Sequence, residues 1–518
     1  MSSFKELLLL LLIVQISRGY KEKGPRFQPT VGEVWPKPNS RINYGDYFEV
    51  SENLNFLVNP GSCAIVQQAV IRYKDMIIEK SKKSYVKSED RATSQIVQNF
   101  QITFTDSCTV NMIPNEEMDE SYTLKSNSLE AKSVWGVLRG LETLSQIIVR
   151  TKLNKLIIPN TLITDAPRFP YRGIMIDTSR HFIEVDKIIE LLDGMSFNKF
   201  NVLHWHMTDD QSFPFDSLVY PNLALKGAYF PDMIYSVQNV IAIVEYARLR
   251  GIRVIPEFDT PGHMGSWAAS HPEIMTKCGG INNGIYGLIN PSVPESWEFL
   301  YNLYEEIFGI FPDKYVHLGA DEVDTDCWET NQGVQDWLVA NNMDNVDLRY
   351  HYLERLAANT SSSFNRLPIL WQEAFIENPG LTLPSKAIAQ IWFDYKAVMA
   401  KITGDGYRTI MSDGWYLYVL DSGGDWEKFY TVEPTNWTGT ASKKELVFGG
   451  EGCLWTEFLN SNNIIPTTFP RASAIAERLW STKETTDIND ATFRLEEHNC
   501  RMMLRGVHCR PANDFGFC

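Results

Sequence analysis

Eight short, continuous apolar runs lie between about residues 170 and 480, and a helix-like segment follows each of them. Runs of this kind suit strands that are buried on both faces, as in a parallel sheet. Eight strand-helix units in succession predict an α/β fold of the (β/α)8 barrel type. An open, doubly wound sheet is the alternative, but no glycine-rich dinucleotide-binding fingerprint follows any run. The runs are residues 173–177, 200–206, 252–259, 315–322, 367–373, 387–393, 407–413 and 446–451.

The residues before the barrel predict a smaller α+β domain. Residues 99–105 read as a strand, and residues 133–149 place apolar side chains three and four positions apart, which predicts a helix with one apolar face. A turn-rich stretch at 164–171 marks the boundary. We therefore expect an N-terminal domain over residues 20–165 and a catalytic barrel domain over residues 166–518.

The first 19 residues predict a signal peptide. Lys5 precedes an apolar run at residues 7–14, and the small residues Ser17 and Gly19 precede the expected cleavage point. This run is too short to span a bilayer, and no other apolar stretch is long enough. The sequence thus predicts a protein of the secretory pathway, either lysosomal or secreted, that is not anchored in a membrane.

Charge and cysteine content agree with that compartment. The formal net charge of −16 would repel nucleic acids and anionic lipid surfaces. The eight cysteines are widely scattered without a Cys-x-x-Cys pair, so disulfides are a better explanation for them than zinc or redox chemistry. Asn359 and Asn436 each begin a glycosylation sequon.

Acidic and aromatic residues gather where the predicted strands end. Active sites of such barrels lie at the C-terminal ends of the strands. Indole rings can stack on the C–H faces of sugars, while carboxylates and arginine bind hydroxyl groups, so the composition favours a carbohydrate site. The residues are Arg180, His181, Asp209, Asp210, Glu257, Asp259, His263, Asp321, Glu322, Trp371, Glu373, Trp392, Trp415, Tyr416, Trp455 and Glu457.

Asp321 and Glu322 are the candidate acid pair. Cleavage of a glycosidic bond needs a proton donor for the leaving oxygen and a group that stabilises positive charge at C1. An isolated acidic dipeptide is more often a helix cap or a surface ion pair. The small residues just before this pair leave space for a ligand, which favours the functional interpretation.

A metal site is the competing interpretation of the histidines. His204 and His206 face the same side of a predicted strand and, with His263 and nearby acids, could bind zinc. A buried, hydrogen-bonded histidine pair explains the same pattern without a metal. We therefore expect neither a metal nor another cofactor.

Five segments together resemble the family 20 β-hexosaminidases, and their order and spacing are similar to the animal lysosomal chains across nearly the whole mature sequence. The resemblance implies an exo-acting, retaining β-N-acetylhexosaminidase that acts on terminal GlcNAc or GalNAc. It implies that the acetamido oxygen of the substrate attacks C1, with Glu322 as general acid and base. Asp321 would orient the acetamido group, and Tyr416 would hydrogen-bond its oxygen. The segments are residues 177–181, 204–210, 257–263, 317–324 and 449–457.

The same resemblance implies roles for further residues. Asp209 and His263 would support Glu322, Arg180 and Glu457 would hold ring hydroxyls, and three tryptophans would enclose the acetamido methyl: Trp371, Trp392 and Trp455. It also implies three disulfides, namely Cys63–Cys108, Cys278–Cys327 and Cys500–Cys518, and a free thiol at Cys453. Cys509 has no counterpart in this scheme.

The sequence departs from the animal chains at three positions. Tyr418 replaces an Asp or Asn that contacts sugar hydroxyls, and Val419 replaces the Arg of chains that accept anionic sugars. Sulfated or sialylated substrates are therefore not expected. Ala320 replaces a glycine before the acid pair.

Two other function classes remain open at this stage. A glycan-binding protein without activity would need hydroxyl contacts but no acid pair, and it would bind N-acetylglucosamine without releasing an aglycone. A metal-dependent hydrolase would lose activity in EDTA. The family resemblance also implies a homodimer.

Overall fold

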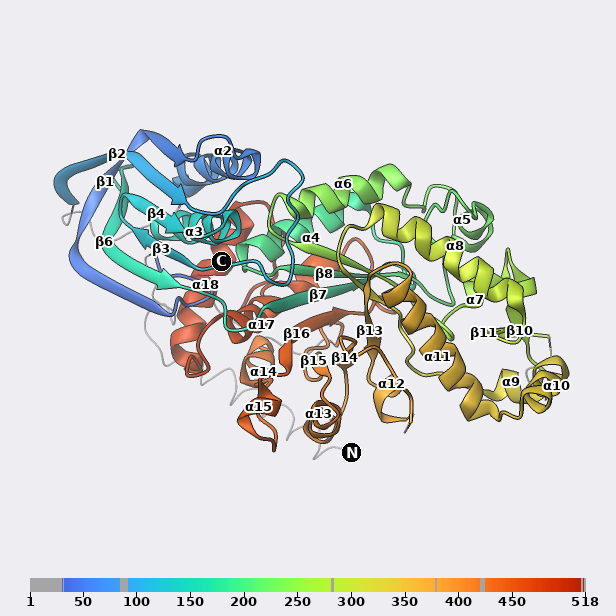
Figure 1. The fold of residues 1–518 in the computed structure, drawn as a ribbon. Coiled ribbons are helices and arrows are strands. Elements are labelled where there is room, and N and C mark those ends of the chain that lie inside the picture. The colour runs from blue at the N-terminus through green and yellow to red at the C-terminus, as the bar shows by residue number, and fades with distance from the viewer. Residues whose placement is uncertain are drawn as a thin grey trace, which may run out of the picture.

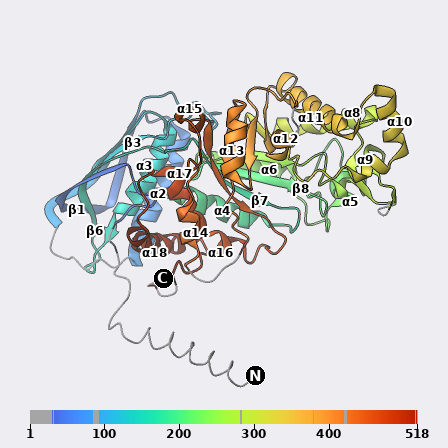
Figure 2. The same cartoon turned by 90° about the horizontal axis from the view of Figure 1, so that it is seen from below.

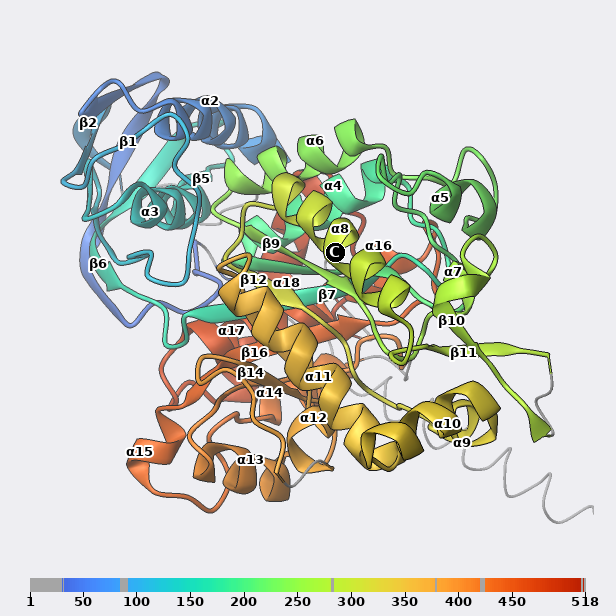
Figure 3. The same ribbon diagram turned by 45° about the vertical axis from the view of Figure 1, so that its right-hand side comes forward.

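The computed structural model describes residues 30–513 except 31, 84–91, 281–283, 378–379 and 420–423, and also residue 516. The predicted signal peptide and Cys518 therefore lie outside the described residues. In every view a sheet domain lies at one end of the molecule and helices α9 (Asp326–Thr330) and α10 (Gln332–Asn341) lie at the other (Figures 1, 2 and 3). Among the described residues, no helix is both long and apolar enough to cross a membrane.

Eight parallel strands close into a barrel, which confirms the predicted (β/α)8 fold. Each strand pairs with the next in chain order, and the last pairs with the first. The strands are β7 (Tyr171–Asp177), β8 (Val202–Thr208), β9 (Arg253–Phe258), β12 (Tyr315–His317), β13 (Leu367–Trp371), β14 (Ile388–Ile391), β15 (Arg408–Met411) and β16 (Val447–Leu454).

Helices surround this barrel and connect its strands (Figure 1). Ser236 caps α6 (Val237–Arg248) through a capping box. A hairpin, β10 (Met275–Lys277) and β11 (Tyr286–Ile289), extends the loop after β9. The other helices are α4 (Val185–Phe197), α5 (Asn222–Gly227), α6 (Val237–Arg248), α7 (Gly265–Ala268), α8 (Pro294–Ile310), α11 (Asn345–Ser362), α12 (Glu373–Ile376), α13 (Tyr395–Gly404), α14 (Trp426–Thr431), α15 (Ala441–Lys444), α16 (Ile464–Thr468), α17 (Arg471–Trp480) and α18 (Ile488–Leu504).

The interior of the barrel changes from apolar to polar along its axis. Each strand contributes one side chain to a buried apolar cluster. Side chains two residues further along a strand point into the same interior, because successive residues alternate between faces. On five strands this next position is polar or aromatic, and these side chains line the C-terminal part of the barrel interior. The apolar cluster is Tyr171, Val202, Ile255, Tyr315, Ile369, Ile388, Ile410 and Phe448, and the next positions include His204, Glu257, His317, Trp371 and Gln390.

A mixed six-stranded sheet forms the N-terminal part. Its order is β1-β2-β4-β3-β6-β5, with an additional pairing between β1 and β6. Helices α2 (Ala64–Ile78) and α3 (Val134–Ile147) pack with this sheet. The strands are β1 (Ser40–Asn59), β2 (Ala92–Phe104), β3 (Tyr122–Lys125), β4 (Ser128–Ala131), β5 (Val149–Arg150) and β6 (Leu156–Asp165).

Helix α3 differs from the sequence-based expectation of one apolar face, because every residue from Val134 to Ile147 is buried. Gly140 lies against Leu129 of β4, and Arg139 reaches the other way to donate to the backbone oxygens of Arg250 and Gly251. The helix is therefore covered by its own sheet on one side and by the barrel domain on the other. Its polar face is paired rather than exposed.

Two of the expected disulfides, Cys63–Cys108 and Cys278–Cys327, are present, and Cys500 is also disulfide-bonded. Cys453 and Cys509 are free thiols. The two sequons differ in setting. Asn436 is exposed between α14 and α15, whereas Asn359 lies in α11 with its amide donating to Ser363. Glycosylation at either position stays a prediction.

Candidate active site

The acid pair lies on a tight turn at the end of β12. Gly319, Ala320 and Glu322 all have left-handed backbone conformations, with φ of 73°, 79° and 50°. A side chain at residue 319 would overlap the Asp259 carboxylate, so glycine is required there. Asp259 accepts a hydrogen bond from the Ala320 N–H at 2.9 Å and holds the turn in place. Such conformations cost on the order of 1–3 kcal/mol each for a non-glycine residue and are concentrated at functional sites.

His263 connects the acid pair to Asp209. Its Nε2 atom lies 3.8 Å from Asp321 Oδ2 and 3.9 Å from Glu322 Oε2, while its Nδ1 atom lies 3.2 Å from Asp209 Oδ1. Asp321 is mostly buried, whereas the Glu322 side chain is 63% exposed. Burial alone would lower the pKa of His263, but Asp321 and Asp209 outweigh it and raise this pKa to about 9. A protonated His263 imidazole therefore lies next to the carboxylates of Asp321 and Glu322.

Arg180 is fixed by carboxylates and an indole ring. Its guanidinium lies 2.8 Å from Asp209 Oδ2, 3.3 Å from Asp177 Oδ2 and 4.8 Å from the ring centre of Trp455. Burial opposes its charge, but Asp177 and Asp209 together raise the pKa of Arg180 above its ordinary value. This arginine has a defined position and a permanent charge with which it can bind a polar substrate group.

Four of the predicted aromatic residues, Trp371, Trp392, Tyr416 and Trp455, form one cluster with Tyr418, and Tyr416 lies close enough to Asp321 to interact with it electrostatically. Trp371 and Trp455 have ring centres 5.9 Å apart, and Tyr416 lies 6.4 Å from Trp392 and 5.9 Å from Tyr418. The free thiol of Cys453 is part of the same cluster. Its apolar faces can enclose a small apolar group.

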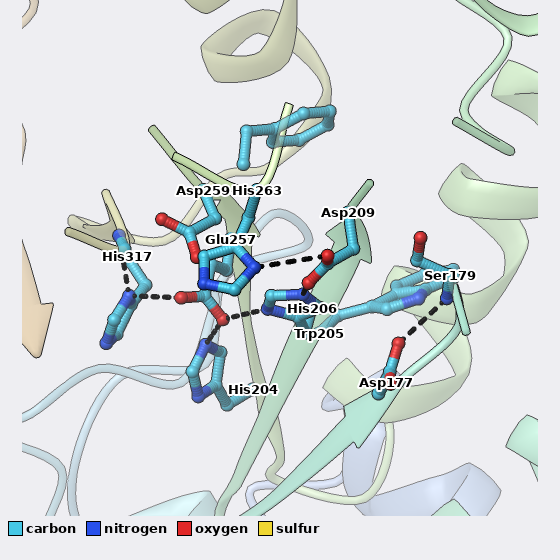
Figure 4. A network of polar contacts seen from close by, with 12 residues as sticks. Asp177, Ser179, His204, Trp205, His206, Asp209, Glu257, Asp259, His263 and His317 are labelled. Atoms are coloured by element: carbon cyan, nitrogen blue, oxygen red, sulfur yellow. Dashed lines mark hydrogen bonds and ion pairs between the residues drawn. The ribbon is translucent and has the colours of Figure 1, made fainter. Parts of the chain in front are cut away.

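A buried chain of histidines and carboxylates lies beneath the site (Figure 4). Glu257 Oε2 is 2.9 Å from His204 Nε2 and 2.6 Å from His206 Nδ1. On the other side of the ring, His206 Nε2 lies 2.9 Å from Asp209 Oδ2. Glu257 Oε1 accepts a hydrogen bond from the indole N–H of Trp371 at 2.9 Å. Sequence reasoning placed Glu257 at the rim and missed this central position. The two-residue spacing from Ile255 could have revealed it, since that spacing directs Glu257 into the barrel.

Several residues predicted at strand ends do not join the acid pair. Trp415 is fully buried and donates to the backbone oxygen of Phe429, so it belongs to the core. His181 contacts the backbone oxygen of Thr456, and Asp210 accepts from the N–H of Gly265. Glu457 is exposed at the end of β16.

Three groups of described residues have spacings that could hold a metal ion. The deepest contains His204, whose two ring nitrogens both contact carboxylates, those of Glu257 and Glu451. Burial opposes protonation, but these carboxylates raise the pKa of His204 to about 9. Because both ring nitrogens already contact carboxylates, the contacts favour a hydrogen-bonded network. The groups are His204, Glu257 and His317; Asp209, Asp210 and His263; and Asp259, His263 and Asp321.

Three histidines of the site, His204, His206 and His263, predict how stability depends on pH above neutrality. Folding raises the pKa from 6.5 to about 9 for His204 and His263 and to about 10 for His206, because nearby carboxylates outweigh burial. Their stabilisation is complete below about pH 6.5 and is lost as the pH rises through the folded-state values. The pKa of Asp209 is lowered, because its histidine contacts outweigh burial, so its contribution is lost as the pH falls below 3.8.

We therefore expect these three histidines to make the denaturant midpoint decrease as the pH rises above about 6.5. Urea unfolding at a series of pH values measures this profile. His206→Gln should reduce the alkaline slope. An unchanged midpoint between pH 6.5 and 9.5 would contradict the proposed protonation of these histidines.

Comparison with known proteins agrees with this geometry. The protein-family model described as "Glycosyl hydrolase family 20, catalytic domain" matches residues 169–483. A second family model, described as "beta-acetyl hexosaminidase like", matches residues 34–147. The chain belongs to glycosyl hydrolase family 20. The family model begins just before β7 and covers all eight barrel strands and the acid pair.

Relatives within family 20 extend over nearly the whole chain. Human beta-hexosaminidase subunit beta is 39% identical over 98% of this chain and 93% of its own length. Rat beta-hexosaminidase subunit alpha is 38% identical over 94% of both chains. The crystal structure of Flavobacterium johnsoniae chitobiase is 28% identical, with a TM-score of 0.79 over 92% of this chain and 73% of that chain.

Proposed function

We propose that this protein is an exo-acting, retaining β-N-acetylhexosaminidase. It removes terminal, non-reducing β-linked GlcNAc or GalNAc from glycoconjugates or chitooligosaccharides. The observation that carries this proposal is the juxtaposition of Asp321, Glu322 and His263 beside the aromatic cluster. The animal β-hexosaminidase relatives support the same activity.

In the proposed reaction the acetamido group of the substrate is the nucleophile. Its carbonyl oxygen attacks C1 while Glu322 donates a proton to the glycosidic oxygen, so the C1–O bond to the leaving group breaks and a cyclic oxazolinium forms. Water then attacks C1, Glu322 takes up its proton, and the C1–O bond of the oxazolinium ring breaks, which restores the acetamido group. Two inversions give net retention, and no enzyme nucleophile is needed, unlike the usual two-carboxylate scheme.

Asp321 is proposed to accept a hydrogen bond from the acetamido N–H and to stabilise the positive charge that develops on the ring. Tyr416 binds the acetamido oxygen from the other side. Together these contacts align the oxygen with C1, and alignment of reacting groups can contribute several kcal/mol to catalysis, about 7–11 kcal/mol in the most favourable cases.

Other residues fix the sugar and the proton donor. Arg180 and Glu457 are proposed to hold ring hydroxyls, and Asp209 with His263 supports Glu322. The three tryptophans enclose the acetamido methyl, which gains roughly 0.8 kcal/mol for each buried carbon. They are Trp371, Trp392 and Trp455.

Localisation, assembly and substrate range are also proposed. The animal relatives support a lysosomal or secreted protein, and we propose a homodimer. Tyr418 lies against Tyr416 and Val419 is largely exposed, and neither of these two side chains offers a cation to a sulfated or sialylated sugar. We therefore propose neutral glycans as substrates.

A pair of aryl β-glycosides near pH 5 tests the proposal. The wild-type protein is expected to release the aryl group from the N-acetylglucosaminide and not from the glucoside that lacks the acetamido group. Equal rates on both would contradict acetamido participation. Binding of N-acetylglucosamine without release from either glycoside would favour a glycan-binding protein.

A further inference from the structure

The turn after β13 contacts Trp392 through two buried side chains. Gln372 Oε1 accepts hydrogen bonds from the backbone N–H groups of Trp392 and Phe393, at 2.9 and 3.2 Å. Glu373 Oε1 accepts from the indole N–H of Trp392 at 2.8 Å. The backbone N–H and the indole N–H of Trp392 therefore donate to Gln372 and Glu373, two consecutive residues just after the neighbouring strand β13.

Trp392 lies just beyond the regular part of its own strand. The ladder of β14 ends at Ile391, and Asp394 already has a left-handed conformation, with φ of 45°. Pairing of the strand therefore does not determine where this indole lies. The side chains of Gln372 and Glu373 are almost fully buried, and their hydrogen bonds to Trp392 can determine the position of this indole.

From this arrangement we propose that Glu373 is a positioning residue that, together with Gln372, holds the Trp392 indole as a wall of the acetamido pocket and so sets the length of acyl group that the pocket accepts. This inference rests on the proposed function, because it assumes that Trp392 faces the acetamido group. Glu373 itself need not touch the substrate.

The electrostatics of Glu373 fit a neutral hydrogen-bond acceptor. Burial, with a further contribution from Asp321, raises its pKa to about 7. At acidic pH the side chain is therefore an uncharged carboxylic acid. It can accept from the indole without adding a second negative charge beside Asp321.

The chemistry of the side chain predicts which substitutions are tolerated. Glu373→Gln keeps a carbonyl oxygen that can accept from the indole N–H. Glu373→Ala removes the acceptor, so the partly buried indole N–H loses its partner; leaving a buried donor unpaired typically costs about 1–3 kcal/mol. The ring is then expected to move, and the pocket should admit a longer acyl chain.

The experiment compares aryl N-acetyl- and N-propanoyl-β-glucosaminides. A well-packed apolar pocket discriminates one methylene by about 10–200-fold, so the wild-type protein should strongly prefer the acetyl substrate in kcat/KM. In Glu373→Ala this preference should fall about tenfold, as expected when the wall is no longer held. Glu373→Gln should retain it. Glu377→Ala is the matched control, because Glu377 is exposed at the end of α12 and pairs with Arg349.

A merely structural role would give a different result. If Glu373→Ala lowered both rates equally and left the preference unchanged, the inference would be wrong. If the wild-type protein hydrolysed neither substrate, the proposed function would fail instead. The two failures are therefore distinguishable.

Trp392→Phe provides a second measurement if Glu373→Ala does not fold. Phenylalanine keeps an aromatic wall but has no N–H, so it should lose the acetyl preference in the same way. The double variant should lose no more of the acetyl preference than either single variant, because both substitutions remove the same hydrogen bond between Glu373 and the Trp392 indole. An additive loss, or a normal preference in Trp392→Phe, would overturn the inference.

Discussion

Glu322→Gln is expected to lower kcat/KM for a chitooligosaccharide by about 10²–10⁴-fold, the usual contribution of general acid–base catalysis. Glutamine has nearly the same shape as glutamate but cannot donate a proton to the glycosidic oxygen. An aryl glycoside with a good leaving group depends less on that proton. The loss should therefore be smaller for cleavage of an activated aryl substrate, and comparing the two substrates separates acid catalysis from a change in binding.

The same substitution should leave the free energy of unfolding nearly unchanged. The Glu322 side chain is 63% exposed, and His263 at 3.9 Å is its nearest charged partner among the described ion pairs. Glu329→Gln is a suitable control, because Glu329 is exposed on the following helix, α9. Near-normal turnover of chitooligosaccharides by Glu322→Gln, with Glu329→Gln also active, would rule out the proposed role of Glu322.

Glu120→Ala should produce the largest loss of stability. Glu120 Oε1 binds Arg139 of α3 at 2.7 Å and Arg172 of β7 at 2.6 Å, and all three side chains are at most 2% exposed. Burial would raise the pKa of Glu120, but Arg172 and Arg139 outweigh it and lower this pKa. The carboxylate thus joins the N-terminal part to the barrel through two buried guanidinium groups.

Removing this carboxylate leaves two buried cations without their shared partner. Breaking a buried ion pair from one side typically costs about 3–5 kcal/mol. We expect a loss of that size in urea unfolding, measured against Glu117→Ala, since Glu117 is exposed three residues earlier in the chain. A loss below about 1 kcal/mol, the usual value of a surface pair, would show that Glu120 does not hold the two parts together.

Periodicity allowed most of the barrel to be predicted from the sequence. Each strand was visible as a short apolar run, because a strand buried on both faces has apolar residues throughout. Strand ends were less certain: β12 ends at His317, whereas the apolar run suggested residue 322. The difference matters, because residues 318–322 form the turn that presents the acid pair.

The candidate site was only partly predictable. The sequence placed Asp321, Glu322, His263 and the aromatic residues at one end of the barrel, because parallel strands align their carboxyl ends. It could not separate Trp415, which is core, from Tyr416, which lies in the aromatic cluster. Adjacent residues point in different directions, and local sequence does not show what covers each side.

Sequence by itself determined the fold class, the family resemblance and the position of the acid pair, since all three depend on local pattern and chain order. Tertiary structure alone decided which distant groups meet. It gave Glu257 its place among the buried histidines, enclosed α3 on both sides, and brought Glu373 to the Trp392 indole. These contacts arise from closure of the barrel and packing of the sheet against it, and they join residues whose separation along the chain carries no signal of contact.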